Sequence, residues 1–377
     1  MVDRESLMEL VVLAAVAREH VLVIGPPGTA KSAAVRRIAQ AVGGGYFEYL
    51  LGRFTEPSEI FGPIDLRRLR EGAVETETSG MLPEAEVAFL DEVFLGSSAI
   101  LNTLLGLLNE RRFRRGHTDV ACPLRVCVGA SNRLPDESSL EAFADRFLVR
   151  IFVDPVADAQ IEELLAAGAQ LSTDGVEIRA TSLAELDVLS DAASRMDHSA
   201  VRGALGHAVR TLRRAGVALS DRRVVKMQQL VASAAALAGR SAPSEADLWP
   251  ILYAVPDREG QELARDALRD LLARSENDSL PAAACEASLG RRARAGRLAI
   301  EASARLDEAP SVADPVTHEA WRLRIESVLR EVDASFAASD LTDELRALRE
   351  RMIAAVGVEP GSETTAPLDP PVTDPDR

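Results

Sequence analysis

The sequence of 377 residues has few aromatic side chains, which make up 4% of the chain, few cysteines and no long apolar run. Hydrophobic residues nevertheless account for 47%, so the core must be built mainly from Ala, Val, Leu and Ile. That composition favours helices over an all-β architecture. No apolar run reaches membrane-spanning length, which argues against insertion into a membrane. The length predicts two or three domains.

The cysteine content indicates the cellular compartment, and the net charge limits the classes of binding partner. Cys122, Cys127 and Cys285 are odd in number and form no CxxC pair, so we expect neither a disulfide framework nor a zinc site, and predict a cytoplasmic protein. The 59 acidic and 43 basic residues give a net charge of −16. A surface of that sign repels phosphate backbones, which argues against general binding to nucleic acid or anionic membranes.

The first apolar segment, Leu10–Ala17, ends like a signal-peptidase site. Its flank carries Asp3, Glu5 and Glu9 instead of a net positive charge. We therefore expect a buried helix there, and not a signal peptide.

Strands and helices alternate through the first 155 residues. Apolar strands are predicted at 20–24, 46–51, 86–90, 125–130 and 148–153, with helices at 4–18, 31–42 and 97–110. This alternation predicts the α/β class, with a parallel five-stranded sheet covered on both faces. Helical patterns alone follow at 157–168, 183–196, 200–215, 221–238 and 245–254. We expect a core at 1–155, a helical lid at 156–256, a C-terminal helical region at 257–356 and a disordered, Pro-rich tail at 357–377.

The segment between the first strand and the next helix fits the phosphate-loop pattern G-x(4)-G-K-S, except that Ala30 replaces the usual glycine. Backbone N–H groups of such a loop surround the β-phosphate, and the helix N-terminus adds its dipole. Lys31 would reach the β- and γ-phosphates, and Ser32 would ligate Mg²⁺. A chance Gly/Pro turn is the weaker explanation, since the segment joins a strand to a helix. The predicted ATP-binding residues here are Gly25, Pro26, Pro27, Gly28, Thr29, Ala30, Lys31 and Ser32.

Four polar residues beside later strands carry the predicted chemistry. Asp91 and Glu92 end an apolar strand, where α/β sheets place their ligands. Asp91 would hold Mg²⁺ through water, and Glu92 would orient or deprotonate the attacking water. Asn132 follows the next strand and would align that water. Arg146 precedes the last strand and would stabilise charge on a neighbouring subunit's γ-phosphate. Taken singly, these residues also fit a solvated strand end, a polar turn and a surface ion pair.

Longer motifs resemble the MoxR family of AAA+ ATPases, and its RavA branch in particular. They are Phe54–Pro63, Thr78–Glu86, Phe89–Glu92, Ala99–Leu105, Leu108–Arg111 and Leu219–Arg223, within a resemblance that runs from residue 4 to residue 255. The resemblance implies an αβα core with an all-helical lid and ATP bound between them. It also implies a Walker B pair at Asp91 and Glu92, sensor 1 at Asn132 and a trans-acting arginine finger at Arg146.

Three further features depend on this resemblance. Arg222 resembles the sensor 2 arginine that contacts nucleotide, with Arg223 as the alternative. Ala30 departs from the general phosphate loop but is similar to the RavA branch. Two insertions, at 66–78 and 112–120, would face the pore of a ring, the second as a β-hairpin.

The function that this resemblance implies is that of a chaperone-like motor. A homo-oligomeric ring, expected to be a hexamer, would hydrolyse Mg-ATP to remodel or assemble a protein partner that often contains a von Willebrand factor A (vWA) domain. One alternative is a nucleotide-dependent scaffold or switch with little turnover. Another is a nucleic-acid translocase, which the basic run Arg111, Arg112, Arg114 and Arg115 would fit, although such a run also fits a solvated face.

Overall fold

The computed structural model describes residues 4–156, 161, 165, 182–288, 298–299, 302–309, 315–335, 341 and 343–356. The chain divides into two compact units, one of residues 1–156 with 160–290 and one of residues 157–159 with 291–377. Most of the expected helix at 157–168 and the whole expected tail at 357–377 lie outside the described residues. Among the helices that are described, none is long and apolar enough to cross a membrane.

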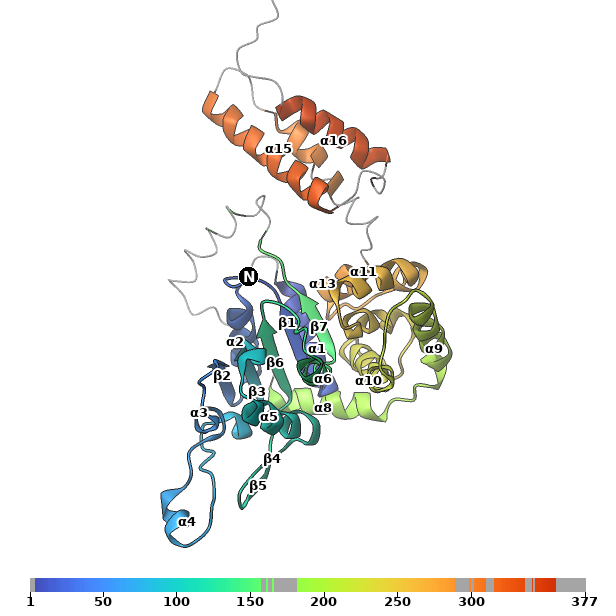
Figure 1. Cartoon of the computed structure of the whole chain (residues 1–377). Coiled ribbons are helices and arrows are strands. Elements are labelled where there is room, and N and C mark those ends of the chain that lie inside the picture. Colours follow the sequence, from blue (N-terminus) through green and yellow to red (C-terminus); the bar gives the residue numbers. More distant parts are fainter. Residues whose placement is uncertain are drawn as a thin grey trace, which may run out of the picture. The chain divides into compact units, whose positions relative to one another are not determined.

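A five-stranded parallel sheet forms the centre of the first unit (Figure 1). Its strands are β1 (Val21–Ile24), β2 (Tyr46–Leu50), β3 (Val87–Asp91), β6 (Val126–Ser131) and β7 (Val149–Phe152). Their order is β2-β3-β6-β1-β7, and every neighbouring pair is parallel. The predicted fold class and sheet are therefore confirmed. Two short 3₁₀ helices flank β3, namely η1 (Leu82–Glu84) and η2 (Val93–Leu95).

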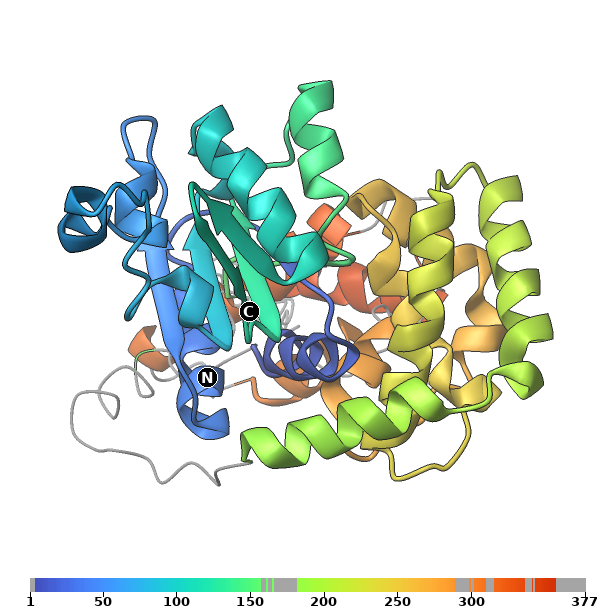
Figure 2. The same cartoon turned by 90° about the horizontal axis from the view of Figure 1, so that it is seen from below.

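Helices cover both faces of this sheet, because successive strand residues point to opposite sides. Val21 and Val23 of β1 pack into one core, whereas Leu22 and Ile24 pack into another. Figure 2 shows helices on either side of the strands. The covering helices are α1 (Glu5–Ala17) and α2 (Lys31–Val42) on the first face, and α3 (Pro57–Phe61), α5 (Ser98–Glu110) and α6 (Ser138–Ala144) on the second.

The chain beyond the sheet continues as helices that share the core around α1. They are α8 (Leu183–Arg195), α9 (Ser199–Arg214), α10 (Asp221–Leu237), α11 (Arg258–Ala267), α12 (Arg269–Leu272) and α13 (Pro281–Ser288). The expected helix at 245–254 is instead two 3₁₀ helices, η4 (Glu245–Asp247) and η5 (Trp249–Ala254). Pro250 lacks the N–H that would bond Ala246 in a continuous α-helix, which accounts for the break.

The second unit has a hydrophobic core of its own. Its described helices include α15 (Pro315–Ser335) and α16 (Asp343–Val356). Trp321 packs in this core, and its Nε1 donates a hydrogen bond to the backbone oxygen of Arg305 at 2.7 Å. The buried core residues are Leu298, Ala299, Ala302, Trp321, Ile325, Val328, Val332, Leu341, Leu345, Leu348 and Met352.

Two segments project together from one end of the sheet (Figure 1). They are the segment with α4 (Leu66–Arg70) and the hairpin of β4 (Arg112–Arg115) and β5 (Thr118–Ala121). The His117 N–H donates to the Val74 oxygen at 2.7 Å, and the Val74 N–H donates to His117 Nδ1 at 3.0 Å. A Cβ at Gly116 would lie 2.5 Å from the Val74 oxygen, so only glycine allows this close packing. The two predicted insertions are thus in contact with each other.

The arginines of the basic run that follows α5 bind groups of the chain itself. Arg112 and Arg114 form ion pairs with Asp119, and Arg114 also pairs with Glu110. Arg115 donates to the backbone oxygen of Gly62 at 3.2 Å. Because exposed acids accompany these guanidinium groups, the hairpin is a surface of mixed charge and not a basic patch.

His20 lies fully buried just before β1, at the amino edge of the sheet. Its Nδ1 accepts the Cys127 N–H at 3.0 Å, which a doubly protonated ring could not do, and its Nε2 lies 3.0 Å from the Leu108 oxygen and 2.7 Å from Arg111 Nη1. Burial lowers the pKa of His20 well below its ordinary value of 6.5, and the nearby Arg111 guanidinium adds to this effect. The fold therefore requires a neutral imidazole here.

The free energy of unfolding is expected to fall as the pH drops below 6.5. In that range His20 becomes protonated in the unfolded chain but stays neutral in the folded chain, where its pKa is lowered. The slope should approach about 1.4 kcal/mol per pH unit until the lowered pKa is reached. Urea titrations between pH 7.5 and 5.5 measure it. His20→Gln should be less stable at pH 7.5 but lack this slope, whereas the exposed control His207→Gln should keep it. A full slope in His20→Gln would assign the effect elsewhere.

Candidate active site

The loops that follow β1, β3 and β6 meet at the carboxyl edge of the sheet. Leu22 of β1 and Leu90 of β3 both pair with Gly129 of β6, because β6 lies between the other two strands. The phosphate loop, the Asp91–Glu92 pair and Asn132 therefore emerge side by side. Asn132 Nδ2 donates a hydrogen bond to Glu92 Oε1 at 2.7 Å, so the structure brings two predicted catalytic residues into direct contact.

The phosphate loop is tightly fitted at its start and open in its middle. The Gly25 N–H donates to the Ser131 oxygen at 3.1 Å, and a Cβ at Gly25 would lie 2.3 Å from the Val153 oxygen. A Cβ at Gly28 would meet nothing within 4 Å. Gly28 and Ala30 have φ of 80° and 58°. Such left-handed residues turn backbone N–H groups inward to form an anion-binding concavity.

Lys31 begins α2 and places its ammonium group inside this loop. Lys31 Nζ donates to the oxygens of Gly25 and Pro26 at 2.8 and 2.9 Å, and the residue is 7% exposed. Burial lowers the pKa of Lys31, whereas the negative charges of Asp91 and Glu92 act to raise it. The ammonium group therefore lies within electrostatic reach of both acids. Ser32 follows in the first turn of α2.

The backbone and the hydrogen bonds of Glu92 hold its carboxylate in a defined position beside Asp91 and Asn132. Its backbone is left-handed, with φ of 49°, and its N–H donates to Asp91 Oδ1 at 3.0 Å. Burial raises the pKa of the Glu92 carboxyl, Asp91 raises it further, and Lys31 opposes the rise. A carboxylate with a raised pKa is a stronger base, and the amide of Asn132 fixes its orientation.

Arg4 is part of the site, although no sequence pattern marks it. It is 4% exposed, and it donates from Nε to the Thr29 oxygen at 3.0 Å and from Nη2 to the Asp154 oxygen at 2.8 Å. Arg4 thus fastens the phosphate loop to the chain that leaves β7. A single arginine before a helix has no periodicity or spacing that would have revealed this contact.

Arg146 lies away from the phosphate loop, toward the amino edge of the sheet, and Arg223 binds the residues beside it. Val149, three residues after Arg146, pairs with the first residue of β1, whereas the phosphate loop follows the last residue of β1. Four strand residues at about 3.3 Å each separate the two levels. Arg146 Nε is buried and has no hydrogen-bond partner among the described residues. The structure therefore does not bring Arg146 or Arg223 to the phosphate loop of their own chain.

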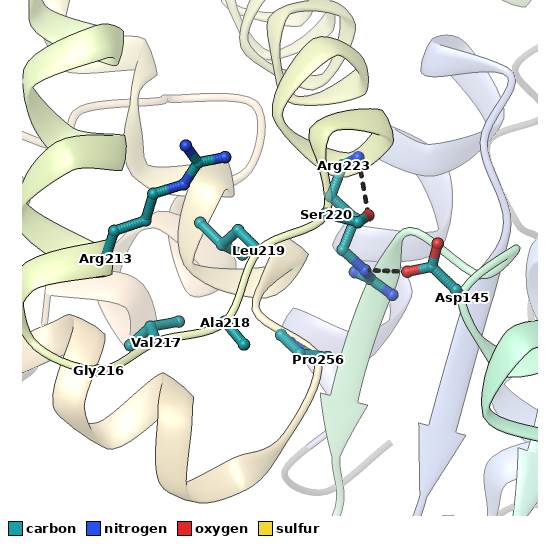
Figure 3. Close-up of a pocket in the computed structure, with 9 residues that line it drawn as sticks. All are labelled: Asp145, Arg213, Gly216, Val217, Ala218, Leu219, Ser220, Arg223 and Pro256. Carbon is teal, nitrogen blue, oxygen red and sulfur yellow. Dashed lines mark hydrogen bonds and ion pairs between the residues drawn. The ribbon is translucent and has the colours of Figure 1, made fainter. Parts of the chain in front are cut away.

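The two sensor 2 alternatives differ in their surroundings, and Figure 3 shows those of Arg223. Arg223 is 1% exposed, and its guanidinium binds Asp145 and three backbone oxygens. Arg222, the preceding residue on α10, has an exposed side chain. Arg222 is thus the arginine that a ligand could contact.

The family described as the MoxR domain in the MoxR-vWA-beta-propeller ternary systems matches residues 1–191, which is half of the chain. The chain belongs to the MoxR family of AAA+ ATPases. The part that carries the MoxR match contains the phosphate loop, both acids, Asn132 and Arg146.

Two relatives and one solved structure show how far the similarity of this MoxR-family chain extends. An uncharacterized protein of Methanocaldococcus jannaschii is 36% identical over 247 residues, which are 65% of this chain and 64% of that protein. The chaperone MoxR1 of Mycobacterium tuberculosis is 27% identical over 168 residues, 44% of each chain. This chain thus spans less than two thirds of either relative. A candidate ATPase of Cytophaga hutchinsonii shares the fold, with a TM-score of 0.58 at 15% identity over 74% of this chain and 91% of that one.

The residues of this MoxR-family site fit the nucleotide and Mg²⁺ that the AAA+ class implies. The left-handed residues Gly28 and Ala30 suit an anion-binding loop, a Cβ at Gly28 would meet nothing within 4 Å, and Lys31 supplies a buried positive charge. Ser32 and Asp91 present the hard oxygen donors that Mg²⁺ prefers.

Ala30→Gly is expected to stabilise the protein or leave it unchanged. Ala30 has φ of 58° and ψ of 26°, a conformation that costs a non-glycine residue roughly 1 kcal/mol, and glycine offsets part of this gain by loosening the unfolded chain. Ala33→Gly, an exposed control with right-handed backbone in the same helix, should instead lose about 0.5–1 kcal/mol. Urea denaturation compares the two. A loss in Ala30→Gly as large as in the control would show that Ala30 carries no strain.

Proposed function

We propose that this chain is an ATP-hydrolysing motor that works as a ring and remodels or assembles a protein partner. The observation that carries the proposal is the division of the site between two edges of the sheet. Lys31, Asp91, Glu92 and Asn132 converge at the carboxyl edge, whereas Arg146 lies at the other edge. A complete site then needs the carboxyl edge of one copy and Arg146 of the next.

The chemistry of this proposal is mainly positioning and charge stabilisation. The loop from Gly25 to Ser32 would bind the phosphates of ATP, and Mg²⁺ held by Ser32 and, through water, by Asp91 would neutralise their charge. Glu92, oriented by Asn132, would accept a proton from the attacking water. Arg146 from the neighbouring copy would stabilise charge on the γ-phosphate. Arg222 of that same neighbouring copy would also contact the nucleotide.

Ring size, branch and partner are parts of the proposal that the family suggests. We infer a hexamer, with the insertion that contains α4 and the β4–β5 hairpin at its pore. We also infer similarity to the RavA branch, on the strength of the Leu219–Arg223 motif. The partner would contain a vWA domain, as the description of the matching family names MoxR-vWA systems.

The motor is tested by steady-state phosphate release at increasing protein concentration. The rate per subunit should rise with concentration and then level off, because neighbouring copies complete each other's sites. Lys31→Ala should abolish both ATP binding, measured by calorimetry, and turnover. ATP binding without turnover would favour a scaffold or switch. Strong, salt-sensitive binding to DNA would favour a translocase instead.

The partner is tested with a Glu92→Gln variant that holds ATP and keeps the motor on its substrate. Proteins retained with ATP, and not without it, should include one with a vWA domain. Retention of proteins that all lack such a domain would refute this part of the proposal while leaving the motor intact.

A further inference from the structure

The segment that carries Arg146 is held by a buried arginine of the lid. Arg223 Nε donates to Asp145 Oδ1 at 2.7 Å, and the Arg223 side chain is 2% exposed in this ion pair. Its Nη2 donates to the Phe147 oxygen at 2.9 Å, and its Nη1 donates to the Leu148 oxygen at 2.8 Å. Arg223 therefore binds the residues on both sides of Arg146.

The same guanidinium also joins two parts of the lid. Arg223 Nη1 donates to the Ala254 oxygen at 2.8 Å, at the end of η5. Its own backbone N–H donates to Ser220 Oγ, the N-cap of α10, at 3.4 Å. Figure 3 shows Arg223 reaching from the start of α10 to Asp145. The first turn of α10, which also carries Arg222, is thus fixed to the Arg146 segment.

A second buried arginine supports this segment from within the sheet. Arg150 of β7 is 2% exposed; its Nε donates to the Phe147 oxygen at 3.1 Å and its Nη2 donates to the Ala144 oxygen. Asp145 is the carboxylate that Arg223 pairs with in this cluster. The backbone on either side of Arg146 is therefore fixed by buried guanidinium groups, while Arg146 itself is half-buried.

We propose that Arg223 is a positioning residue that sets the arginine finger from the lid. It would hold Arg146 and Arg222 in one fixed arrangement, so that a subunit presents both to its neighbour only while its own lid is docked on Asp145. This inference rests on the proposed trans role of Arg146. It differs from the sensor role, because Arg223 would act on the neighbour's site without touching nucleotide.

Mixed rings of full-length subunits separate the two sides of each site. An acceptor subunit carries Arg146→Ala and keeps its own phosphate loop, and a donor subunit carries Lys31→Ala and keeps its finger. Each alone should be inactive, and the mixture should release phosphate. An inactive mixture would refute the proposed shared site itself, before Arg223 is tested.

Arg223→Met is then added either to the donor subunit or to the acceptor subunit. In the donor it should lower phosphate release by the mixture by roughly 100-fold, the effect of a misplaced catalytic group. In the acceptor it should leave the mixture active, with unchanged ATP affinity. Equal losses on both sides would indicate a purely structural role, a loss only in the acceptor would indicate a nucleotide sensor, and no loss would refute the proposal.

Two further variants guard against misfolding. Asp145→Asn keeps the size of the side chain that pairs with Arg223 but removes its charge. In the donor it should lower phosphate release by the mixture, but by less than Arg223→Met does. Arg240→Met breaks the Arg240–Asp247 ion pair, 2.7 Å long, whose carboxylate is fully buried elsewhere in the lid. Donors with Arg240→Met should support the acceptor normally. If they fail as Arg223→Met donors do, general destabilisation of the lid explains both results and the proposal is wrong.

Discussion

Arg146→Ala is expected to lower kcat for ATP hydrolysis by roughly 1,000-fold or more, the range that arginine fingers contribute in other NTPases. The Kd for ATP should change little, because Arg146 lies at the edge of the sheet opposite the phosphate loop. Its buried Nε also has no acceptor among the described residues, so the substitution removes no hydrogen bond of that atom. Multiple-turnover phosphate release and calorimetric ATP titration measure the two quantities.

Two comparisons make the Arg146 result specific. Arg202→Ala removes an exposed arginine of α9 and should leave kcat unchanged. Addition of the Lys31→Ala subunit to Arg146→Ala should restore hydrolysis, because it supplies an intact finger in trans. Normal kcat in Arg146→Ala, or a loss that no added subunit restores, would contradict a finger shared between copies.

Glu92→Gln is expected to retain ATP binding and to lower hydrolysis by roughly 100- to 10,000-fold, as the loss of a general base does. Glutamine can still accept the hydrogen bond from Asn132 Nδ2, so the local arrangement should survive. Single-turnover phosphate release and calorimetry give the rate and the affinity. Glu141→Gln, at an exposed position of α6, is the control and should hydrolyse ATP normally.

The pH dependence of hydrolysis provides a second readout of Glu92. Because its pKa is raised by burial and by Asp91, the rate should be lost on acidification at a pH above that at which an ordinary glutamate protonates. Normal hydrolysis by Glu92→Gln would refute the role of the carboxylate as base. A variant that no longer binds ATP would show that Glu92 serves binding instead.

The sheet and one half of the site could be predicted because their signals are local. Short apolar runs alternate with helical periodicity, and polar residues such as Asp91 and Asn132 stand where those runs end. In a parallel sheet such ends must share one edge, so their proximity follows from topology alone. The contact between Asn132 and Glu92 is the outcome of that rule.

The arginines show where local patterns stop. Arg4 and Arg223 are buried by residues far away in the chain, and both donate hydrogen bonds to backbone oxygens, which leave no trace in residue identity. The sequence likewise placed both Arg222 and Arg223 at the same helix start, and only the packing of α10 distinguishes the exposed one from the buried one. The helix expected at 245–254 failed for a different, local reason, because Pro250 lacks the N–H that a continuous α-helix needs there.

Because Arg146 and Lys31 lie at opposite ends of β1, variants at the two positions should behave differently in genetic experiments. In the proposed ring, a substitution at Arg146 would abolish hydrolysis by the adjacent copy and leave the phosphate loop of its own copy competent. Alleles at the two positions should therefore complement each other when expressed together, and a finger-defective allele should interfere with the normal one in proportion to its dosage. An incomplete assembly of copies would likewise always contain one terminal protomer whose nucleotide has no finger beside it.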